Sequence, residues 1–254
     1  MTIRLSTRLR SNLAGPTGFA ATFNNGVIDV YTGTQPTTAD SAATGTLLGT
    51  ITQSSGAYTA ETLASQTITV AGSSGSINTV TVGTLNIIPL GAVNFITDAA
   101  TTAAALSAAI NRAGLYTATV SGAVVTVKAP AGTGATHNGV AFATTVTTLT
   151  ATVGAATLSG GVTAVNGLTF AEASAGAVSK TGVWSFSGVA AGTAGWFRLR
   201  ASPADAGSAD TTFIYPRLDG SVAVSGADMN LSNITIAIGA PSTVDSFTWT
   251  QPAS

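Results

Sequence analysis

The sequence predicts a mainly β protein, an immunoglobulin-like β-sandwich with an inserted small α+β module. First, Thr, Val, Ile, Gly and Asn recur throughout the 254 residues with turn-forming residues every few positions, which is the pattern of many short strands. Second, one long segment has helical periodicity instead. Third, the aromatic residues are unevenly distributed: all three Trp lie after residue 180, whereas the stretch from about 63 to 164 holds only Phe95, Tyr116 and Phe142.

Strands are predicted where β-branched and aromatic residues run between turn residues. Before the first strand, residues 2–13 fit either a short helix or an extended arm. Two strands form a hairpin through Ser121-Gly122, a two-residue turn in which glycine supplies a positive φ. Turns are also predicted at Asp219-Gly220 and at 226–228. The predicted strands are 27–31, 67–70, 79–82, 116–120, 123–128, 183–186, 196–200 and 244–250.

The one long helix is predicted near 101–113. Ala103, Leu106, Ala109 and Ile110 recur there at helical spacing, so they place apolar side chains on one face. Asp98 or Thr101 can cap the start of this helix, and Gly114 can end it at the position that favours a left-handed backbone. The helix therefore spans about three turns.

The distribution of aromatic residues and helix predicts two domains. Residues 1–62 and 165–254 form the β-sandwich, with an N-terminal arm at 1–14, and residues 63–164 form the inserted α+β module. The segments at both boundaries are mostly small and polar, as linkers are. The alternative is one continuous large β domain.

Composition excludes several functional classes. The chain has no Cys and one His, which excludes a zinc–thiolate site and a disulfide framework. Its net charge is −1 with only 9 Lys and Arg, which argues against nucleic-acid binding. No window of 18 consecutive apolar residues occurs, so no membrane span is expected. The first residues lack the apolar segment of a signal peptide, and synthesis in the cytoplasm is expected.

No catalytic, cofactor-binding or metal-binding residue is predicted. His137 lies in a Gly-rich segment and is interpreted as a loop residue rather than a general base. Lys180-Thr181-Gly182 matches one motif of penicillin-recognising serine enzymes, but Ala177 stands where that chemistry needs a Ser nucleophile. Asp205 and Asp210 could hold a weak calcium ion, although a polar turn is the preferred interpretation.

The remaining candidates concern interactions. Arg4, Arg8 and Arg10 form the only basic cluster, which either binds an acidic partner surface or lies on a solvated arm. Charged residues make up only 7 % of the chain, and a surface so poor in charge fits a protein that is covered by copies of itself or by a neighbour. Five aromatic residues are expected in the sandwich core: Trp184, Phe186, Trp196, Phe197 and Trp249.

Several segments resemble structural proteins of tailed-bacteriophage virions. In the two terminal parts these are GVIDVYTGTQP at 26–36, Ala39-Asp40, ATGTLLG at 43–49, AGTAGWFRL at 191–199 and SGADMNL at 225–231. The middle part is similar to a module common in phage virion and tail proteins. Its matching segments are the helix at 102–111 and the hairpin at 116–127.

This resemblance implies a non-enzymatic virion component made in the host cytoplasm. The preferred function is a capsid decoration or cement protein that docks on the head lattice. The alternatives are a neck or tail accessory protein and a receptor- or glycan-binding adhesin. The implied partners are the major capsid protein or neck and tail proteins, together with copies of the chain itself, and neither nucleic acid nor membrane.

Overall fold

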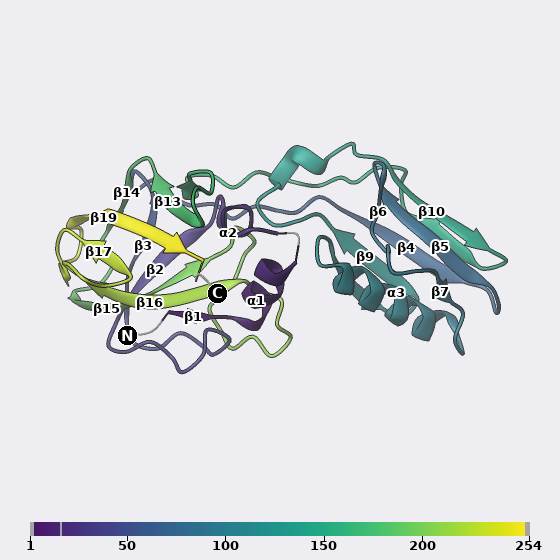
Figure 1. Ribbon diagram of the computed structural model, residues 1–254, viewed down its shortest axis with the longest axis horizontal. Coiled ribbons are helices and arrows are strands. Elements are labelled where there is room, and N and C mark those ends of the chain that lie inside the picture. The colour runs from purple at the N-terminus through teal and green to yellow at the C-terminus, as the bar shows by residue number, and fades with distance from the viewer. Residues whose placement is uncertain (1–2, 16, 252–254) are drawn as a thin grey trace. The chain divides into compact units, whose positions relative to one another are not determined.

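A computed structural model describes residues 3–15 and 17–251 of the chain (Figure 1). The fold is mainly β, as predicted. The chain divides into two compact units. Unit 1 comprises Met1–Glu61 and Ala164–Ser254, and unit 2 comprises Thr62–Thr163. Each boundary lies one residue before the position expected from the sequence.

Unit 1 is a β-barrel, and the expected immunoglobulin-like sandwich is not confirmed. Neighbouring strands pair in the order β16-β15-β2-β3-β14-β19, and β17 pairs with both β19 and β16. This double pairing closes the sheet on itself, so no second sheet faces the first across a sandwich core. The ring strands are β2 (Val27–Thr32), β3 (Leu47–Gln53), β14 (Trp184–Ser187), β15 (Gly192–Arg200), β16 (Arg217–Ala223), β17 (Met229–Leu231) and β19 (Pro241–Thr250).

Short elements extend the ring of unit 1. β13 pairs with β19 and carries β12 at its other edge, while β18 pairs with the start of β15 and β1 with β16. The bounds of these and of the two short helices are β1 (Arg4–Leu5), α1 (Thr7–Ala14), α2 (Phe19–Phe23), β12 (Thr169–Phe170), β13 (Ala177–Thr181) and β18 (Thr235–Ile236).

The N-terminal segment is docked on the barrel. β1 pairs with β16, and helix α1 then begins after Ser6, whose hydroxyl accepts a hydrogen bond from the Leu9 amide. Leu9 is fully buried in the core of unit 1. The segment is therefore a short strand followed by a helix docked on the barrel, and the expected N-terminal arm at 1–14 is not a free arm along its described residues, although Arg10, Ser11 and Ala14 are exposed.

The core of unit 1 fills the barrel with aromatic and aliphatic side chains. Trp184 packs against Phe247, and Phe197 also contacts Phe247 edge-on. Both Phe247 and Trp249 of β19 are buried, because alternate residues of a strand face the interior. Trp184, Phe186, Phe197 and Trp249 all lie in this core, as predicted.

The turn predicted at Asp219-Gly220 is wrong. Both residues lie inside β16, where Asp219 pairs with Arg198 of the neighbouring strand. A Cβ atom at Gly220 would lie 2.6 Å from the Phe197 ring, so glycine is required there for close packing rather than for a turn. The turn predicted at 226–228 is present, with Gly226 at a φ of 73°.

Unit 2 consists of two four-stranded sheets and one helix around its own core. One sheet has the order β10-β5-β6, with β7 also paired to β5, and the other has the order β11-β4-β9-β8. The strands are β4 (Ser65–Ala71), β5 (Ser76–Val82), β6 (Leu85–Asn86), β7 (Val93–Asn94), β8 (Thr117–Ser121), β9 (Val124–Lys128), β10 (Phe142–Thr147) and β11 (Thr150–Val153). A short 3₁₀ helix spans Gly134–His137.

Helix α3 spans Ala99–Ala113, two residues longer at its start than expected. The Asp98 carboxylate accepts a hydrogen bond of 2.7 Å from the Thr101 amide, so Asp98 is the cap. Gly114 ends the helix with a φ of 84°. The hairpin that follows is also present. Its two turn residues are Gly122 and Ala123, one position later than expected, and Gly122 has the positive φ.

Asn111 on α3 covers the free edge of β8. Its side-chain oxygen accepts from the Ala118 amide at 2.9 Å, and its side-chain nitrogen donates to the Ala118 carbonyl at 2.8 Å. The amide group thus pairs with the backbone as a neighbouring strand would. Covering an edge in this way limits pairing with foreign strands.

We expect Asn111→Ala to expose this edge. The Ala118 amide should exchange with solvent about fivefold faster, because one hydrogen bond contributes on the order of 1 kcal/mol. Hydrogen exchange followed by NMR measures this rate. The Val125 amide in the adjacent β9 is the internal control, and equal acceleration at both positions would indicate general destabilisation instead.

Candidate functional site

A group of charged residues lies on the outer face of β2, β15 and β16 in unit 1. Ile28, Val30, Phe197, Leu199 and Leu218 of these strands belong to the interior core. The residues between them point outward by strand alternation. This outer face carries Asp29, Tyr31, Trp196, Arg198, Arg200, Arg217 and Asp219.

Three ion pairs form on this outer face. Arg198 Nε and Nη2 each donate to one carboxylate oxygen of Asp219 at 2.8 Å, and both side chains are fully buried. Arg217 forms a second bidentate pair with Asp205, at 2.7 and 2.6 Å. Arg200 Nε donates to Asp29 at 2.6 Å. Buried charges of this kind must be paired, because an unpaired buried charge carries a large desolvation cost.

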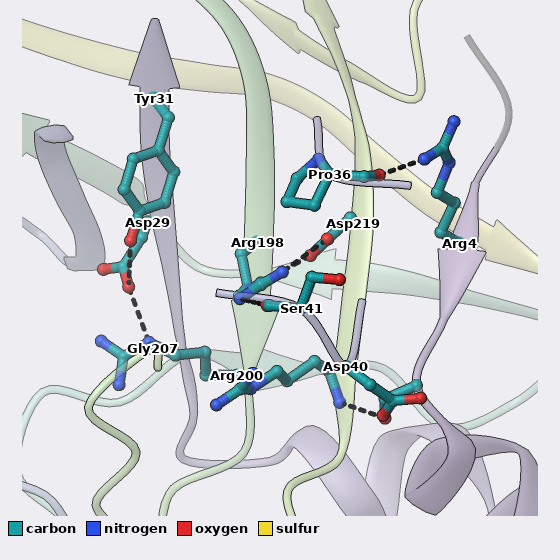
Figure 2. Close-up of polar contacts among 12 residues, drawn as sticks. Arg4, Asp29, Tyr31, Pro36, Asp40, Ser41, Arg198, Arg200, Gly207 and Asp219 are labelled. Atoms are coloured by element: carbon teal, nitrogen blue, oxygen red, sulfur yellow. Dashed lines mark hydrogen bonds and ion pairs between the residues drawn. The ribbon is translucent and has the colours of Figure 1, made fainter. Parts of the chain in front are cut away.

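Two loops of unit 1 cover these ion pairs. In the loop at 33–46, the Ser41 carbonyl accepts a hydrogen bond of 2.9 Å from Arg198 Nη1. Figure 2 shows Arg198 contacting both Ser41 and Asp219. The loop at 201–216 supplies Asp205. The two loops also bond to each other, from the Ala43 amide to the Gly207 carbonyl and from the Asp210 amide to the Asp40 carbonyl.

The loop at 33–46 also fixes the start of helix α1. Both carboxylate oxygens of Asp40 accept from the Thr7 amide, at 3.0 and 3.1 Å, and one accepts from the Thr7 hydroxyl at 2.8 Å. A carboxylate at a helix N-terminus satisfies free amides and complements the helix dipole. The outer-face charges therefore hold the two loops on the barrel, and Asp40 of the loop at 33–46 holds the N-terminal segment.

An aromatic pair completes the outer face. Tyr31 stacks on Trp196 with ring centroids 4.6 Å apart, and the Arg198 guanidinium lies 5.5 Å from the Trp196 centroid. Trp196 is fully buried as expected, but on this outer face under the loops rather than in the main core cluster.

Burial shifts the pKa values of several side chains in unit 1. Burial raises the pKa of Asp219, and the bonds from Arg198 only partly offset this. Burial lowers the pKa of Arg200, but the adjacent Asp29 outweighs this effect and the net shift is upward. Burial, followed by the charge of Asp29, raises the pKa of Tyr31 to about 12. Burial is also the main cause that raises the pKa of Tyr58 to about 12.

These two tyrosines predict alkaline sensitivity. A tyrosine with a raised pKa in the folded state favours folding while it is neutral. Its contribution is complete below the unfolded pKa near 10 and is lost as pH rises through about 12. Unfolding free energy should therefore fall between those pH values, as measured by urea unfolding. In Tyr31→Phe this fall should be smaller, and an unchanged pH profile would contradict the prediction.

The three arginines predicted to bind a partner do not lie on a free arm. Arg4 donates to the Pro36 carbonyl, as Figure 2 shows. Arg8 is half-buried, and burial lowers its pKa. Arg10 is exposed and donates to the Thr7 hydroxyl at 3.0 Å. Their binding to an acidic partner stays a prediction, with Arg10 as the most accessible of the three.

The other candidate residues have local structural contacts. The His137 ring packs edge-on against Tyr116 at 6.0 Å, and burial lowers its pKa. Lys180 donates to the Gly182 carbonyl at 3.2 Å. Asp205 binds Arg217, and Asp210 accepts from the Tyr215 amide at 2.8 Å. Over residues 3–15 and 17–251, no three His, Cys, Asp or Glu side chains gather as a metal site would require.

A recess of about 490 Å³ lies within the loop at 33–46. Thr34, Gln35, Ser41 and Thr44 are among its lining residues, and no charged side chain lines it. Its lining offers hydroxyl, amide and backbone groups for hydrogen bonding.

Comparison with known proteins adds no family assignment. No protein-family model matches the chain, and no curated protein matches it. In the part of the chain that the structure describes, no helix is both long and apolar enough to cross a membrane.

Proposed function

We propose that the chain is a non-enzymatic structural protein of a tailed-bacteriophage virion, where it acts as a capsid decoration or cement protein on the head lattice. Its partners are then the major capsid protein and further copies of itself. The observation that carries this proposal is how few charges the protein presents to solvent.

Charge is nearly absent from unit 2. Its only charged side chains are Asp98, Arg112 and Lys128, whereas about a quarter of the residues in an average soluble domain are charged. In unit 1, the three ion pairs withdraw six more charged side chains from solvent. Covering such a surface with a partner desolvates few charges, which favours a protein built for repeated contacts.

Hydroxyl groups replace the missing charges on one face of unit 2. Thr67, Thr126 and Thr119 lie opposite one another across β4, β9 and β8. In the next row, Thr69 lies opposite Thr152 of β11. These side chains alternate with buried Ile68, Val125 and their neighbours, so they lie on the outer face of the sheet. A hydroxyl-lined sheet stays hydrated without the repulsion between like charges that would oppose dense packing of copies.

Four of the five terminal segments that resemble virion proteins also meet in one place. The stretches at 26–36, 39–40 and 43–49 lie in β2, the loop at 33–46 and the start of β3, and the segment at 191–199 forms most of β15 beside β2. Arg198 and Asp29, one from each segment, lie opposite each other in the pairing of the two strands. The fifth stretch of the terminal parts, 225–231, includes β17, which pairs with β16 and β19 instead.

Mass spectrometry and immunogold electron microscopy of the purified phage test this proposal. Label over the head, with a copy number comparable to that of the capsid protein, is the expected result. Label confined to the neck or tail would instead favour the accessory-protein or adhesin alternatives. Absence of the chain from purified virions would overturn the virion proposal altogether.

A further inference from the structure

The N-terminal segment of unit 1, residues 3–14, is docked on the barrel by apolar side chains. Ile3, Leu5 and Leu13 pack against the core of unit 1, and Leu9 is fully buried within that core. Strand β1 of this segment pairs with β16, as Figure 1 shows. The part of the barrel under the segment therefore has an occupant in the structure, which is the segment itself.

Polar contacts fix how the N-terminal segment docks. The Ser6 amide donates to the Arg217 carbonyl at 3.0 Å, and the Ser6 hydroxyl accepts from the Arg217 amide at 2.9 Å. The Thr7 hydroxyl donates to the Asp40 carboxylate at 2.8 Å. These partners are 211 and 33 positions apart along the chain. The same residues of a second copy would therefore offer the segment the same contacts.

A short linker connects the N-terminal segment to the rest of unit 1. Its sequence is Gly15-Pro16-Thr17-Gly18. At its two ends the backbone is extended, with φ and ψ of −104° and −159° at Gly15 and of −74° and 171° at Gly18. An extended linker of this length spans at most about 18 Å between the Cα atoms of Ala14 and Phe19. A second copy can therefore receive the segment only when the two barrels lie close together.

We propose that the N-terminal segment of one copy docks on the barrel of a second copy, in the same site that it occupies in its own chain. Such an exchange replaces each contact within a chain by the identical contact between chains, so it needs no additional complementary surface. Reciprocal exchange gives a closed dimer, and one-way exchange gives a row of copies. This interface goes beyond the proposed virion function, because it needs no other viral protein.

The concentration of the chain decides which form of docking prevails. Because the contacts are identical in both forms, the free-energy difference between them comes mainly from the linker. A short linker holds the segment near its own site at an effective concentration on the order of millimolar. Docking within one chain should therefore prevail in dilute solution. Exchange should become substantial when the copies themselves are crowded to about that concentration.

Disulfide trapping tests the exchange, because the chain has no cysteine and only introduced thiols can react. A Thr7→Cys chain and an Asp40→Cys chain are unfolded together in urea, refolded at about millimolar concentration and oxidised. These side chains touch when the segment docks. Peptide mass spectrometry should find a disulfide that joins positions 7 and 40 of different chains. Its yield should fall at least about tenfold when refolding and oxidation take place at micromolar concentration.

Two controls accompany the trapping. Leu90→Cys in place of Asp40→Cys measures random collision, because Leu90 is 68 % exposed in unit 2 and does not belong to the docking site. Its yield should be at least about tenfold lower at the same concentration. Thr7→Cys/Asp40→Cys in one chain should form the bond internally when dilute. Leu5→Cys with Leu218→Cys repeats the test at a second contact, because these residues lie opposite each other in β1 and β16.

Deletion of Thr17 and Gly18 tests the exchange without a disulfide. Half of the linker is then missing, so the segment should no longer turn back onto its own barrel. Sedimentation velocity should show dimers or larger assemblies at a concentration at least about tenfold below that needed by the unmodified chain. Thr17→Ser/Gly18→Ser keeps the length and is the matched control. A Cβ atom at Gly18 would meet no described atom within 4 Å beyond its chain neighbours, so this variant should behave like the unmodified chain.

Three results would overturn the exchange. The first is a disulfide between positions 7 and 40 that forms only within single chains at every concentration. The second is an equal yield with Leu90→Cys, which would indicate random collision. The third is a linker-deletion variant that is folded by circular dichroism but monomeric up to millimolar concentration. Because the experiments use only the purified chain, their failure is distinguishable from absence of the chain in virions.

Discussion

Arg198→Met is expected to lower the unfolding free energy of unit 1 by about 3–5 kcal/mol, the usual cost of removing one partner of a buried ion pair. The substitution leaves the Asp219 carboxylate buried without its bidentate donor. It also removes the donor to the Ser41 carbonyl, so the loop at 33–46 loses an anchor on the barrel. Urea unfolding followed by Trp fluorescence measures the effect, because all three Trp lie in unit 1.

A second variant separates the destabilisation caused by the unpaired charge from the destabilisation caused by lost packing. In Arg198→Met/Asp219→Leu no charge is left buried at this position, so most of the lost stability should return. Arg10→Met is the control for removing a positive charge at an exposed position, where the change should stay within about 0.5 kcal/mol. If Arg198→Met lowers the unfolding free energy no more than Arg10→Met does, the Arg198–Asp219 ion pair does not hold the outer face together.

The outer-face ion pairs were not predicted from the sequence, although a signal for them exists. Arg198 and Arg200 are two residues apart, as are Arg217 and Asp219, so each pair lies on one face of its strand. Asp29 has the same relation to Tyr31 in β2. Alternating charges in strands normally indicate a solvated face, and only the long-range placement of the covering loops makes this face buried.

Local elements were predictable because their signals are local. The cap at Asp98, the apolar spacing along α3 and the glycine at 114 lie within one short stretch, and the structure has the helix there. The positive φ of Gly122 follows in the same way from a two-residue turn. Such features depend on residues that are neighbours in the chain.

Barrel closure was not predictable, because it depends on residues that are far apart in the chain. The ring is closed by the three residues of β17, which pair in parallel with β16 and antiparallel with β19. A three-residue strand carries no alternation that distinguishes it from a turn. Its pairing depends on where the other strands bring their edges, and a sandwich and a barrel share the same alternating strand pattern.

Leu106→Ala is expected to destabilise unit 2 by about 2–5 kcal/mol and to leave unit 1 unchanged. Leu106 is fully buried on α3 within the core cluster of unit 2, and that cluster shares no residue with the core of unit 1. Hydrogen exchange measured on peptides from 62–163 should show faster exchange. The Trp fluorescence transition in urea should keep its midpoint, because every Trp reports on unit 1.

Leu199→Ala is the matched substitution in the other core. Leu199 is fully buried in β15, and its truncation should shift the Trp transition by a similar free energy while peptides from 62–163 keep their exchange rates. If either substitution shifted both signals together, the two units would unfold as one cooperative structure. Independent unfolding would instead mean that unit 2 is stabilised by its own core, since two separate clusters of buried side chains contribute to two separate transitions.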